Sequence, residues 1–219
     1  MDKVKREFDN ESDFINKYGY KYPKNALSIF YHCYQKAEIQ QMFYATNKLE
    51  DYDIYESLVD DLIELGFDIG CNILDVASGY YPAFGYEIAG RQLQLNKGTV
   101  TCIDPKLVCG TPYHKNVKLV RDNFTKEYDL SSYDLIVSSL PCEVSYELFA
   151  ALMNSNKDFF VYPCNCMPVF ADNQTGLFWL DLYGYCRKYE RENNIETRLI
   201  NCKFFNNPYA SNRAIIYRK

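Results

Sequence analysis

The fold of this chain is decided by the stretch Asn72-Ile73-Leu74-Asp75-Val76-Ala77-Ser78-Gly79-Tyr80-Tyr81-Pro82-Ala83-Phe84-Gly85. A short apolar run ends near an acid, and a loop of small residues with two glycines follows. A helical pattern then runs from Tyr86 to Leu95, and a second apolar strand, 99–103, ends on Asp104. Strand, tight loop, helix, strand and acid form the outline of a nucleotide-binding βαβ unit. In such a unit the loop lets backbone approach a ligand, and the acid accepts the hydroxyls of a ribose.

The details of the loop favour one kind of nucleotide ligand over another. Dinucleotide-binding proteins carry G-x-G-x-x-G, because a pyrophosphate must sit on the helix N-terminus. This chain has Ala77-x-Gly79 and then Gly85, with Asp75 ahead of the loop. We expect an acid in this position to repel a pyrophosphate and to suit a zwitterionic, cationic ligand.

These residues resemble motif I of the class I S-adenosylmethionine-dependent methyltransferases, whose usual form is D/E-x-G-x-G-x-G. Asp75 fits the first position, Ala77 replaces the first glycine, Gly79 fits the second and Gly85 is a displaced third. The resemblance implies S-adenosylmethionine as cofactor and Asp104 as the residue that holds its ribose. It also implies that five residues surround the methionine part of the cofactor: Asp75, Ala77, Ser78, Gly79 and Tyr80.

The rest of the chain alternates strands and helices in an order that extends the resemblance. Further strands are predicted at 117–121, 134–138, 158–162, 197–205 and 213–217, with helices at about 143–153 and 177–192. The last two strands form a hairpin around the loop 206–212. The expected fold is α/β, with a Rossmann-like, seven-stranded, mostly parallel sheet. By resemblance, its last strand inserts antiparallel between strands 5 and 6.

Residues 1–70 are predicted to form an N-terminal helical extension or lid, ahead of a methyltransferase-like domain at 71–219. A helix from Asn25 or Ser28 to Ala45 is expected, and 51–65 has the apolar spacing of an amphipathic helix that ends at Gly66. The tyrosine-rich turn at 18–23 is either a packed surface loop or a lid over the active-site mouth.

Substrate chemistry is expected at the end of the strand 134–138. Amino-methylating enzymes of the family carry [D/N/S]-P-P-[Y/F/W] there, and this chain has Ser139-Leu140-Pro141-Cys142. The resemblance therefore gives three candidate catalytic residues: Ser139, Pro141 and Cys142. It adds three residues to the cofactor site: Asp122 and Asn123 beside the adenine, and Ser138 at the opening of the strand.

Several alternatives remain open at this level. Cytosine-5 methyltransferases use a cysteine after one of these strands as a thiolate nucleophile, and Cys142 and Cys164 both follow a proline at such a position. A non-catalytic, methyltransferase-like module that binds cofactor or a partner is a second alternative. A dinucleotide-dependent oxidoreductase is a third, disfavoured by Asp75 and the terminal hairpin.

Composition limits the setting in which the protein works. The 219 residues are 47% hydrophobic, enough for a full core, yet no apolar run is long enough to predict a membrane span. An odd set of nine scattered cysteines predicts reduced thiols in a cytoplasm. The net charge of −5 argues against strong unspecific nucleic-acid binding.

Cys164-Asn165-Cys166 lacks a nearby second ligand pair, so no metal site is expected. The methyl acceptor and the oligomeric state are not specified by the sequence.

Overall fold

The computed structural model describes residues 12–13, 53–79, 81–107, 112, 114–141, 144–163, 178–193, 195–202 and 213–219. Contacts divide the chain into two compact units, Met1–Glu50 and Asp51–Lys219. The helices and strands described below all belong to the second unit. The predicted helix at 25–45 and the tyrosine-rich turn at 18–23 lie outside the described residues.

Seven strands form one sheet in the spatial order β3-β2-β1-β4-β5-β7-β6. Strands β1 to β5 pair in parallel, and β7 lies antiparallel between β5 and β6. The predicted sheet and its inserted antiparallel last strand are therefore confirmed. The strands are β1 (Asn72–Val76), β2 (Thr99–Ile103), β3 (Val117–Val120), β4 (Leu135–Ser139), β5 (Asp158–Tyr162), β6 (Arg198–Asn201) and β7 (Arg213–Tyr217).

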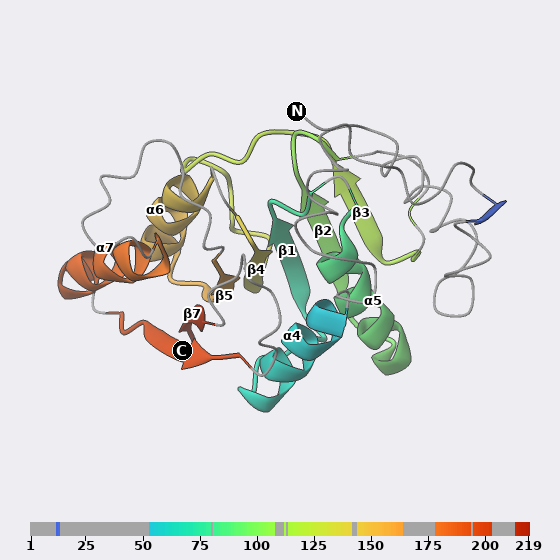
Figure 1. Ribbon diagram of the computed structural model, residues 1–219, viewed down its shortest axis with the longest axis horizontal. Coiled ribbons are helices and arrows are strands. Elements are labelled where there is room, and N and C mark those ends of the chain that lie inside the picture. Colours follow the sequence, from blue (N-terminus) through green and yellow to red (C-terminus); the bar gives the residue numbers. More distant parts are fainter. Residues whose placement is uncertain are drawn as a thin grey trace. The chain divides into compact units, whose positions relative to one another are not determined.

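Helices cover both faces of this sheet, as Figure 1 shows. Helices α4 (Asp53–Glu64) and α5 (Ala83–Leu95) pack on one face, and α6 (Ser145–Ser155) and α7 (Phe178–Asn193) pack on the other. Adjacent residues of β1 divide between the two cores, because side chains alternate along a strand. Ile73 joins the core under α4 and α5, whereas Leu74 and Val76 join the core under α6 and α7.

The start of α5 differs from the prediction. The helix begins at Ala83 rather than Tyr86, with Pro82 at its N-cap and the Tyr86 N–H donating to the Pro82 carbonyl at 2.9 Å. Proline is well tolerated at a helix start, because the first helical N–H groups have no partner in the helix. Gly85 therefore lies inside the first turn of the helix and is not part of the loop.

Helix α4 ends where the sequence predicts. Gly66 has a φ of +79°, its N–H donates to Ile63, and the Phe67 N–H donates to Leu62. These two bonds form a Schellman motif, in which glycine relieves the strain of the left-handed residue. Helix α4 packs with the sheet in the second unit, whereas the role of residues 1–70 as an extension or lid remains a prediction. None of the helices in the described part of the chain has the length and apolar character needed to span a membrane.

Candidate cofactor and substrate site

Asp75 lies near the end of β1, beneath the glycine loop. Its side chain is almost fully buried, with 1% exposed, and Oδ2 accepts a hydrogen bond from the Gly85 N–H at 3.1 Å. Its Oδ1 has no hydrogen-bond partner within the described part of the chain. The pKa of Asp75 is raised to about 8: burial raises it, the bond from Gly85 lowers it, and nearby Asp104 adds a smaller rise.

This position changes the physical argument that Asp75 repels a pyrophosphate. At neutral pH the carboxyl is largely protonated, so repulsion by a full charge is not the main effect. Instead, Oδ2 already accepts from Gly85 in the first turn of α5, where a phosphate would otherwise bind the free N–H groups. The carboxyl therefore takes up part of the anion-binding capacity of this helix N-terminus.

The glycine loop makes a tight turn over the ends of β1 and β2. Ala77 and Gly79 both adopt left-handed backbone, with φ of +59° and +75°. The Ser78 N–H donates to Ile103 at 3.3 Å, and the Gly79 N–H donates to Asp104 Oδ2 at 3.0 Å. A Cβ built on Gly79 would meet no atom of the described residues within 4 Å. The loop thus leaves room for a ligand to approach the backbone at Gly79.

Asp104 is half-buried at the end of β2, as the sequence places it. Its Oδ1 accepts a hydrogen bond from the Lys106 N–H at 2.7 Å, while its Oδ2 binds Gly79. Each carboxylate oxygen has two lone pairs, so both oxygens keep capacity to accept a ligand hydroxyl. The two backbone bonds fix the orientation of the carboxylate beside the loop.

Gly85 has a packing role that its displaced position in the sequence concealed. A Cβ at this residue would lie 2.4 Å from Cys102 Sγ and 3.0 Å from Asp75 Oδ2. Only glycine allows α5 to approach β1 and β2 this closely. In the G-x-G-x-x-G motif the third glycine has the same purpose, which is close packing of the helix on the strand.

The end of β4 lies next to this loop, because β4 pairs with β1. Ser138 is buried, and its Oγ donates to the Val76 carbonyl at 2.7 Å, which joins the two strands. Ser139 Oγ is buried and has no well-aligned hydrogen bond within the described residues. Leu140 has a φ of +58°, and its N–H donates to the Tyr162 carbonyl at 2.7 Å. Strained backbone of this kind is concentrated at functional sites.

The predicted site residues therefore separate into four groups. Two of them, Asp122 and Asn123, are exposed after β3, where Asp122 Oδ1 accepts from the Asn123 N–H at 2.8 Å. Pro141 follows the strained Leu140, and its carbonyl accepts from Ser145 Oγ. Tyr80, Cys142 and Cys164 lie outside the described residues. The structure brings the remaining eight together at the ends of β1, β2 and β4: Asp75, Ala77, Ser78, Gly79, Gly85, Asp104, Ser138 and Ser139.

Buried polar atoms without a partner are concentrated at this site. Across the described residues, four side-chain atoms are in this state, and three of them are Asp75 Oδ1, Ser78 Oγ and Ser139 Oγ. Leaving a buried polar atom unpaired costs about 1–3 kcal/mol. This concentration is typical of a site that a polar ligand completes.

Tyr55 of α4 lies beside these residues, and the sequence analysis did not include it in the candidate site. Its ring stacks on Phe84, with centroids 6.0 Å apart and an interplanar angle of 28°. Its hydroxyl lies close enough to Asp75 and Ser139 for both to affect its pKa. The sequence does contain one indication that Tyr55 faces inward. It precedes Leu58 and Leu62 at helical spacing, and both leucines are buried.

Strand order and structural comparison identify the fold. Neither family models nor curated protein sequences give a match to this chain. Among solved structures, the plantazolicin methyltransferase BpumL in complex with SAH aligns at a TM-score of 0.50 and 10% identity, covering 95% of this chain and 99% of that chain. The chain has the class I methyltransferase fold.

Two further methyltransferase-fold structures align over most of the same region. The methyltransferase domain of bacterial CtHen1 has a TM-score of 0.47 and 12% identity, covering 78% of this chain and 100% of that chain. A complex of DhpI with SAM and HEP has a TM-score of 0.46 and 11% identity, covering 82% of this chain and 96% of that chain.

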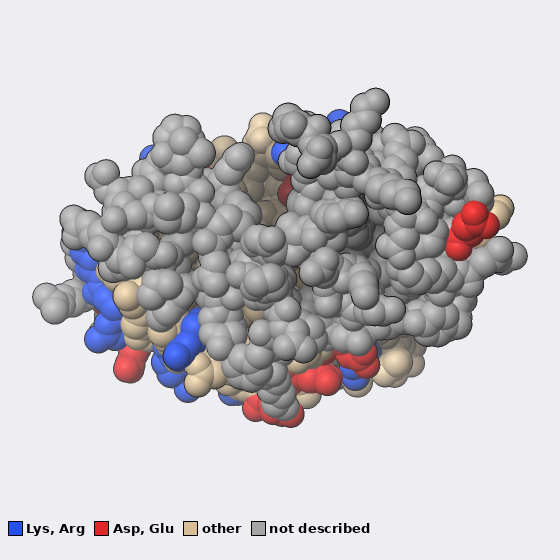
Figure 2. All heavy atoms as spheres, viewed as in Figure 1, with Lys and Arg blue, Asp and Glu red and all other residues tan. Residues whose placement is uncertain are grey.

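Charged side chains of the methyltransferase-fold unit are distributed unevenly on the face in Figure 2. Most of the described Lys and Arg atoms visible there lie toward the left, in the region of α7 and the C-terminal strands of Figure 1. Several of the described acidic side chains visible there lie along the lower edge, in the region of α4. Within the described residues, no three His, Cys, Asp or Glu side chains come together as a metal site.

Proposed function

We propose that this protein binds S-adenosylmethionine at the carboxyl ends of β1, β2 and β4 and transfers its methyl group to an acceptor. The observation that carries the proposal is the bond from the Gly79 N–H to Asp104 Oδ2, at 3.0 Å. It places an oriented carboxylate beside a loop with open space at Gly79. The carboxylate is then positioned to accept hydrogen bonds from the ribose.

The unpartnered polar atoms support the same ligand. Asp75 Oδ1, Ser78 Oγ and Ser139 Oγ are acceptors, and the α-ammonium of S-adenosylmethionine has three donors. A dinucleotide fits less well, because Asp75 occupies the first turn of α5 where the pyrophosphate would bind. On this view Asp75, Ala77, Ser78, Gly79 and Tyr80 surround the methionine end, and Asp122 and Asn123 lie toward the adenine.

The chain's own contribution to the reaction is alignment and exclusion of water. The bound cofactor supplies an electrophilic methyl group on a sulfonium, which the acceptor's lone pair attacks in line. Such a reaction requires close positioning of the reactants more than an acid–base pair. We propose that the backbone around Ser139 and Pro141 accepts hydrogen bonds from the acceptor, with Cys142 next in the sequence. Nothing in the described residues specifies the acceptor, which is a small molecule or a nitrogen of a nucleic acid or protein.

A reducing compartment such as the cytoplasm is part of this proposal. The described cysteines Cys71, Cys102, Cys186 and Cys202 are all free thiols, and the last three are buried. Burial raises the pKa of Cys102 and Cys186, which keeps their thiols protonated and unreactive. Buried free thiols are typical of proteins that remain in a reducing environment.

Calorimetric titration with S-adenosylmethionine, S-adenosylhomocysteine and NADH tests the cofactor assignment. We expect both sulfur compounds to bind and NADH not to bind. The Asp104→Asn variant should bind S-adenosylhomocysteine at least about tenfold more weakly, a loss of about 1.4 kcal/mol. Asp158→Asn is the matched control, because this acid lies at the opposite, amino end of β5.

Three results separate the candidate functions. Absence of binding by both sulfur compounds at millimolar concentration would refute the proposal. Binding without methyl transfer to any tested acceptor class would instead support the non-catalytic module. A Cys142→Ser variant that retains full transfer would exclude Cys142 as a thiolate nucleophile, and the same test applies to Cys164.

A further inference from the structure

Helix α4 makes apolar contacts with the sheet and with α5, and one of the side chains that make them, Tyr55, also carries a hydroxyl group. Leu58 and Leu62 of this helix are fully buried against the sheet, and Tyr55 precedes them on the same face. The Tyr55 ring stacks on Phe84 in the first turn of α5, next to Gly85. A phenylalanine would make the same ring contact without burying a hydroxyl. The hydroxyl therefore calls for a separate explanation.

The hydroxyl of Tyr55 points toward the ends of β1 and β4. The side chain is partly exposed, but burial of its hydroxyl end raises the pKa of Tyr55 to about 12. The Asp75 carboxyl adds to this rise, and the nearby Ser139 side chain opposes it. Since Asp75 and Ser139 extend from the sheet face that α4 covers, three polar side chains from three elements meet here. We call them the Tyr55–Asp75–Ser139 cluster.

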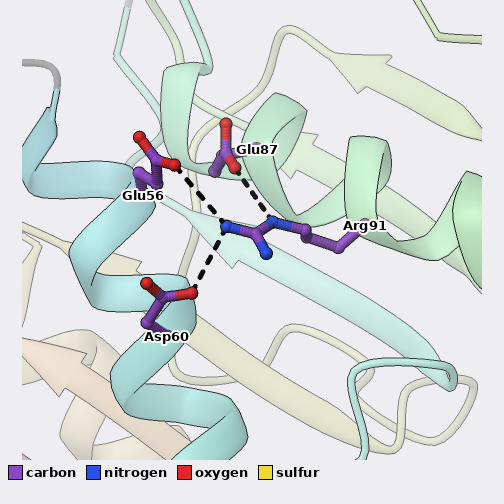
Figure 3. Close-up of polar contacts among 4 residues, drawn as sticks. All are labelled: Glu56, Asp60, Glu87 and Arg91. Carbon is purple, nitrogen blue, oxygen red and sulfur yellow. Dashed lines mark hydrogen bonds and ion pairs between the residues drawn. The ribbon is translucent and has the colours of Figure 1, made fainter.

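An ion-pair network holds α4 in the position that brings Tyr55 to this cluster. Figure 3 shows Arg91 of α5 between acids of both helices. Its Nη2 lies 3.3 Å from Asp60 and 3.8 Å from Glu56 of α4, and its Nε lies 3.3 Å from Glu87 of α5. Glu56 is the residue after Tyr55, so the network links the turn of α4 that carries the hydroxyl to α5. The location of Tyr55 is therefore determined by α5 as well as by the sheet.

We propose that Tyr55, together with Asp75 and Ser139, binds the α-amino acid end of the sulfonium cofactor. This inference rests on the proposed function, and it makes α4 part of the cofactor site. The cluster presents oxygen acceptors from three side chains, and two of these acceptors have no well-aligned partner within the described residues. An α-ammonium group offers three hydrogen-bond donors, which matches this set of oxygen acceptors. The adenosine end would remain with Asp104 on the other side of the glycine loop.

Two probes that differ only at the relevant end of the ligand test this assignment. S-adenosylhomocysteine carries the amino acid end, whereas 5′-methylthioadenosine lacks it and keeps the ribose and adenine. Affinities of both probes for the full chain are measured by calorimetry. We expect Tyr55→Phe to weaken S-adenosylhomocysteine binding about tenfold and to leave methylthioadenosine binding unchanged. Ser139→Ala should show the same selective loss.

Matched variants distinguish binding from a structural role. Asp104→Asn should weaken both probes, because both contain the ribose. Tyr217→Phe removes a hydroxyl that bonds Asn156 at 3.1 Å near the amino end of β5, and it should change neither affinity. Equal losses of both probes in Tyr55→Phe would indicate general damage to the site and would overturn the assignment.

The same measurements separate this inference from the proposed function. If the unmodified protein binds both probes and Tyr55→Phe leaves both affinities unchanged, the assignment of Tyr55 is wrong while cofactor binding stands. If the unmodified protein binds neither probe, the proposed function itself is wrong, and the assignment falls with it.

Discussion

The backbone N–H of Gly85 donates a hydrogen bond to Asp75 Oδ2 across 3.1 Å, joining the end of β1 to the first turn of α5. A carboxyl group is favourable at this place, because its oxygen accepts from a first-turn N–H that has no partner within the helix. The same contact requires a residue without a Cβ, since α5 lies too close to β1 and β2 for one. One short contact thus explains both the acid and the displaced glycine of the motif.

Replacing Gly85 by alanine should destabilise the protein strongly. The new Cβ would lie 2.4 Å from Cys102 Sγ and 3.0 Å from Asp75 Oδ2, so α5 would have to move away from the sheet. Overpacking of this kind costs about 1–3 kcal/mol. Gly184→Ala is the matched control, because a Cβ there meets nothing within 4 Å among the described residues and alanine favours the helix. Urea unfolding measures both; equal effects would contradict the packing role of Gly85.

Replacing Asp75 by asparagine should alter how stability depends on pH. The pKa of Asp75 is about 8 in the folded protein, against an ordinary value of 3.8 that we take for the unfolded chain. Between these values the folded state keeps a proton that the unfolded state releases. Stability contributed by this group is therefore complete below about pH 4 and is lost as the pH rises toward 8. One proton changes the free energy of unfolding by at most about 1.4 kcal/mol per pH unit.

Asparagine removes this titration while keeping an acceptor for Gly85. We expect the stability of Asp75→Asn relative to the unmodified protein to increase steadily from pH 5 to pH 8. Urea unfolding at four pH values gives the difference between the two proteins, in which the other titrating groups largely cancel. A difference that does not vary with pH would show that Asp75 is ionised in the folded protein.

Replacing Ala77 by glycine should stabilise the glycine loop. Ala77 has a φ of +59°, and left-handed backbone costs a residue with a Cβ about 1–2 kcal/mol. Glycine removes this strain but gains about 0.5–1 kcal/mol of entropy in the unfolded chain. We therefore expect a net increase of up to about 1.5 kcal/mol in the free energy of unfolding. Ala151→Gly in the middle of α6 is the control and should lose stability; a loss in Ala77→Gly as well would argue against strain at this position.

Replacing Arg91 by alanine should loosen α4 from α5. The variant loses three ion pairs and leaves Glu56, Asp60 and Glu87 to repel one another. Because all four side chains are at least partly exposed, we expect a loss of about 1 kcal/mol at low salt. The loss should shrink near 1 M salt, where charges are screened within about 3 Å.

The control for Arg91 is Lys126→Ala, which removes a single exposed ion pair with Glu127. Thermal unfolding at two salt concentrations should show almost no change for Lys126→Ala. An Arg91→Ala effect that is independent of salt would indicate that packing of the arginine stem, rather than its charge, stabilises α4.

Local patterns predicted most of the architecture. The strands 72–76, 99–103, 158–162 and 213–217 have the predicted bounds, because apolar runs between turn residues leave little choice of conformation. The predicted start of α5 is misplaced, because the prediction follows the helical periodicity from Tyr86 and treats Pro82, a common helix-start signal, as part of the loop. Gly85 was consequently interpreted as a loop residue, although its function is helix packing.

The site was predictable only in part. The loop 77–79 and Asp104 follow from their positions at strand ends, because parallel strands bring their carboxyl ends to one edge of a sheet. Tyr55 could not be assigned from sequence, as its spacing on an amphipathic helix is equally typical of an ordinary core residue. Its proximity to Asp75 and Ser139 depends on how α4 packs against α5.

The sequence by itself determined the order of strands and helices, the glycine loop and the two acids at strand ends, because these depend on local periodicity and turn chemistry. Only the tertiary structure decided which polar groups meet. It buried Asp75 and raised its pKa, bonded Gly79 to Asp104, and brought Tyr55 to the ends of β1 and β4. These properties arise from desolvation and from contacts between residues distant in the chain, which no local pattern specifies.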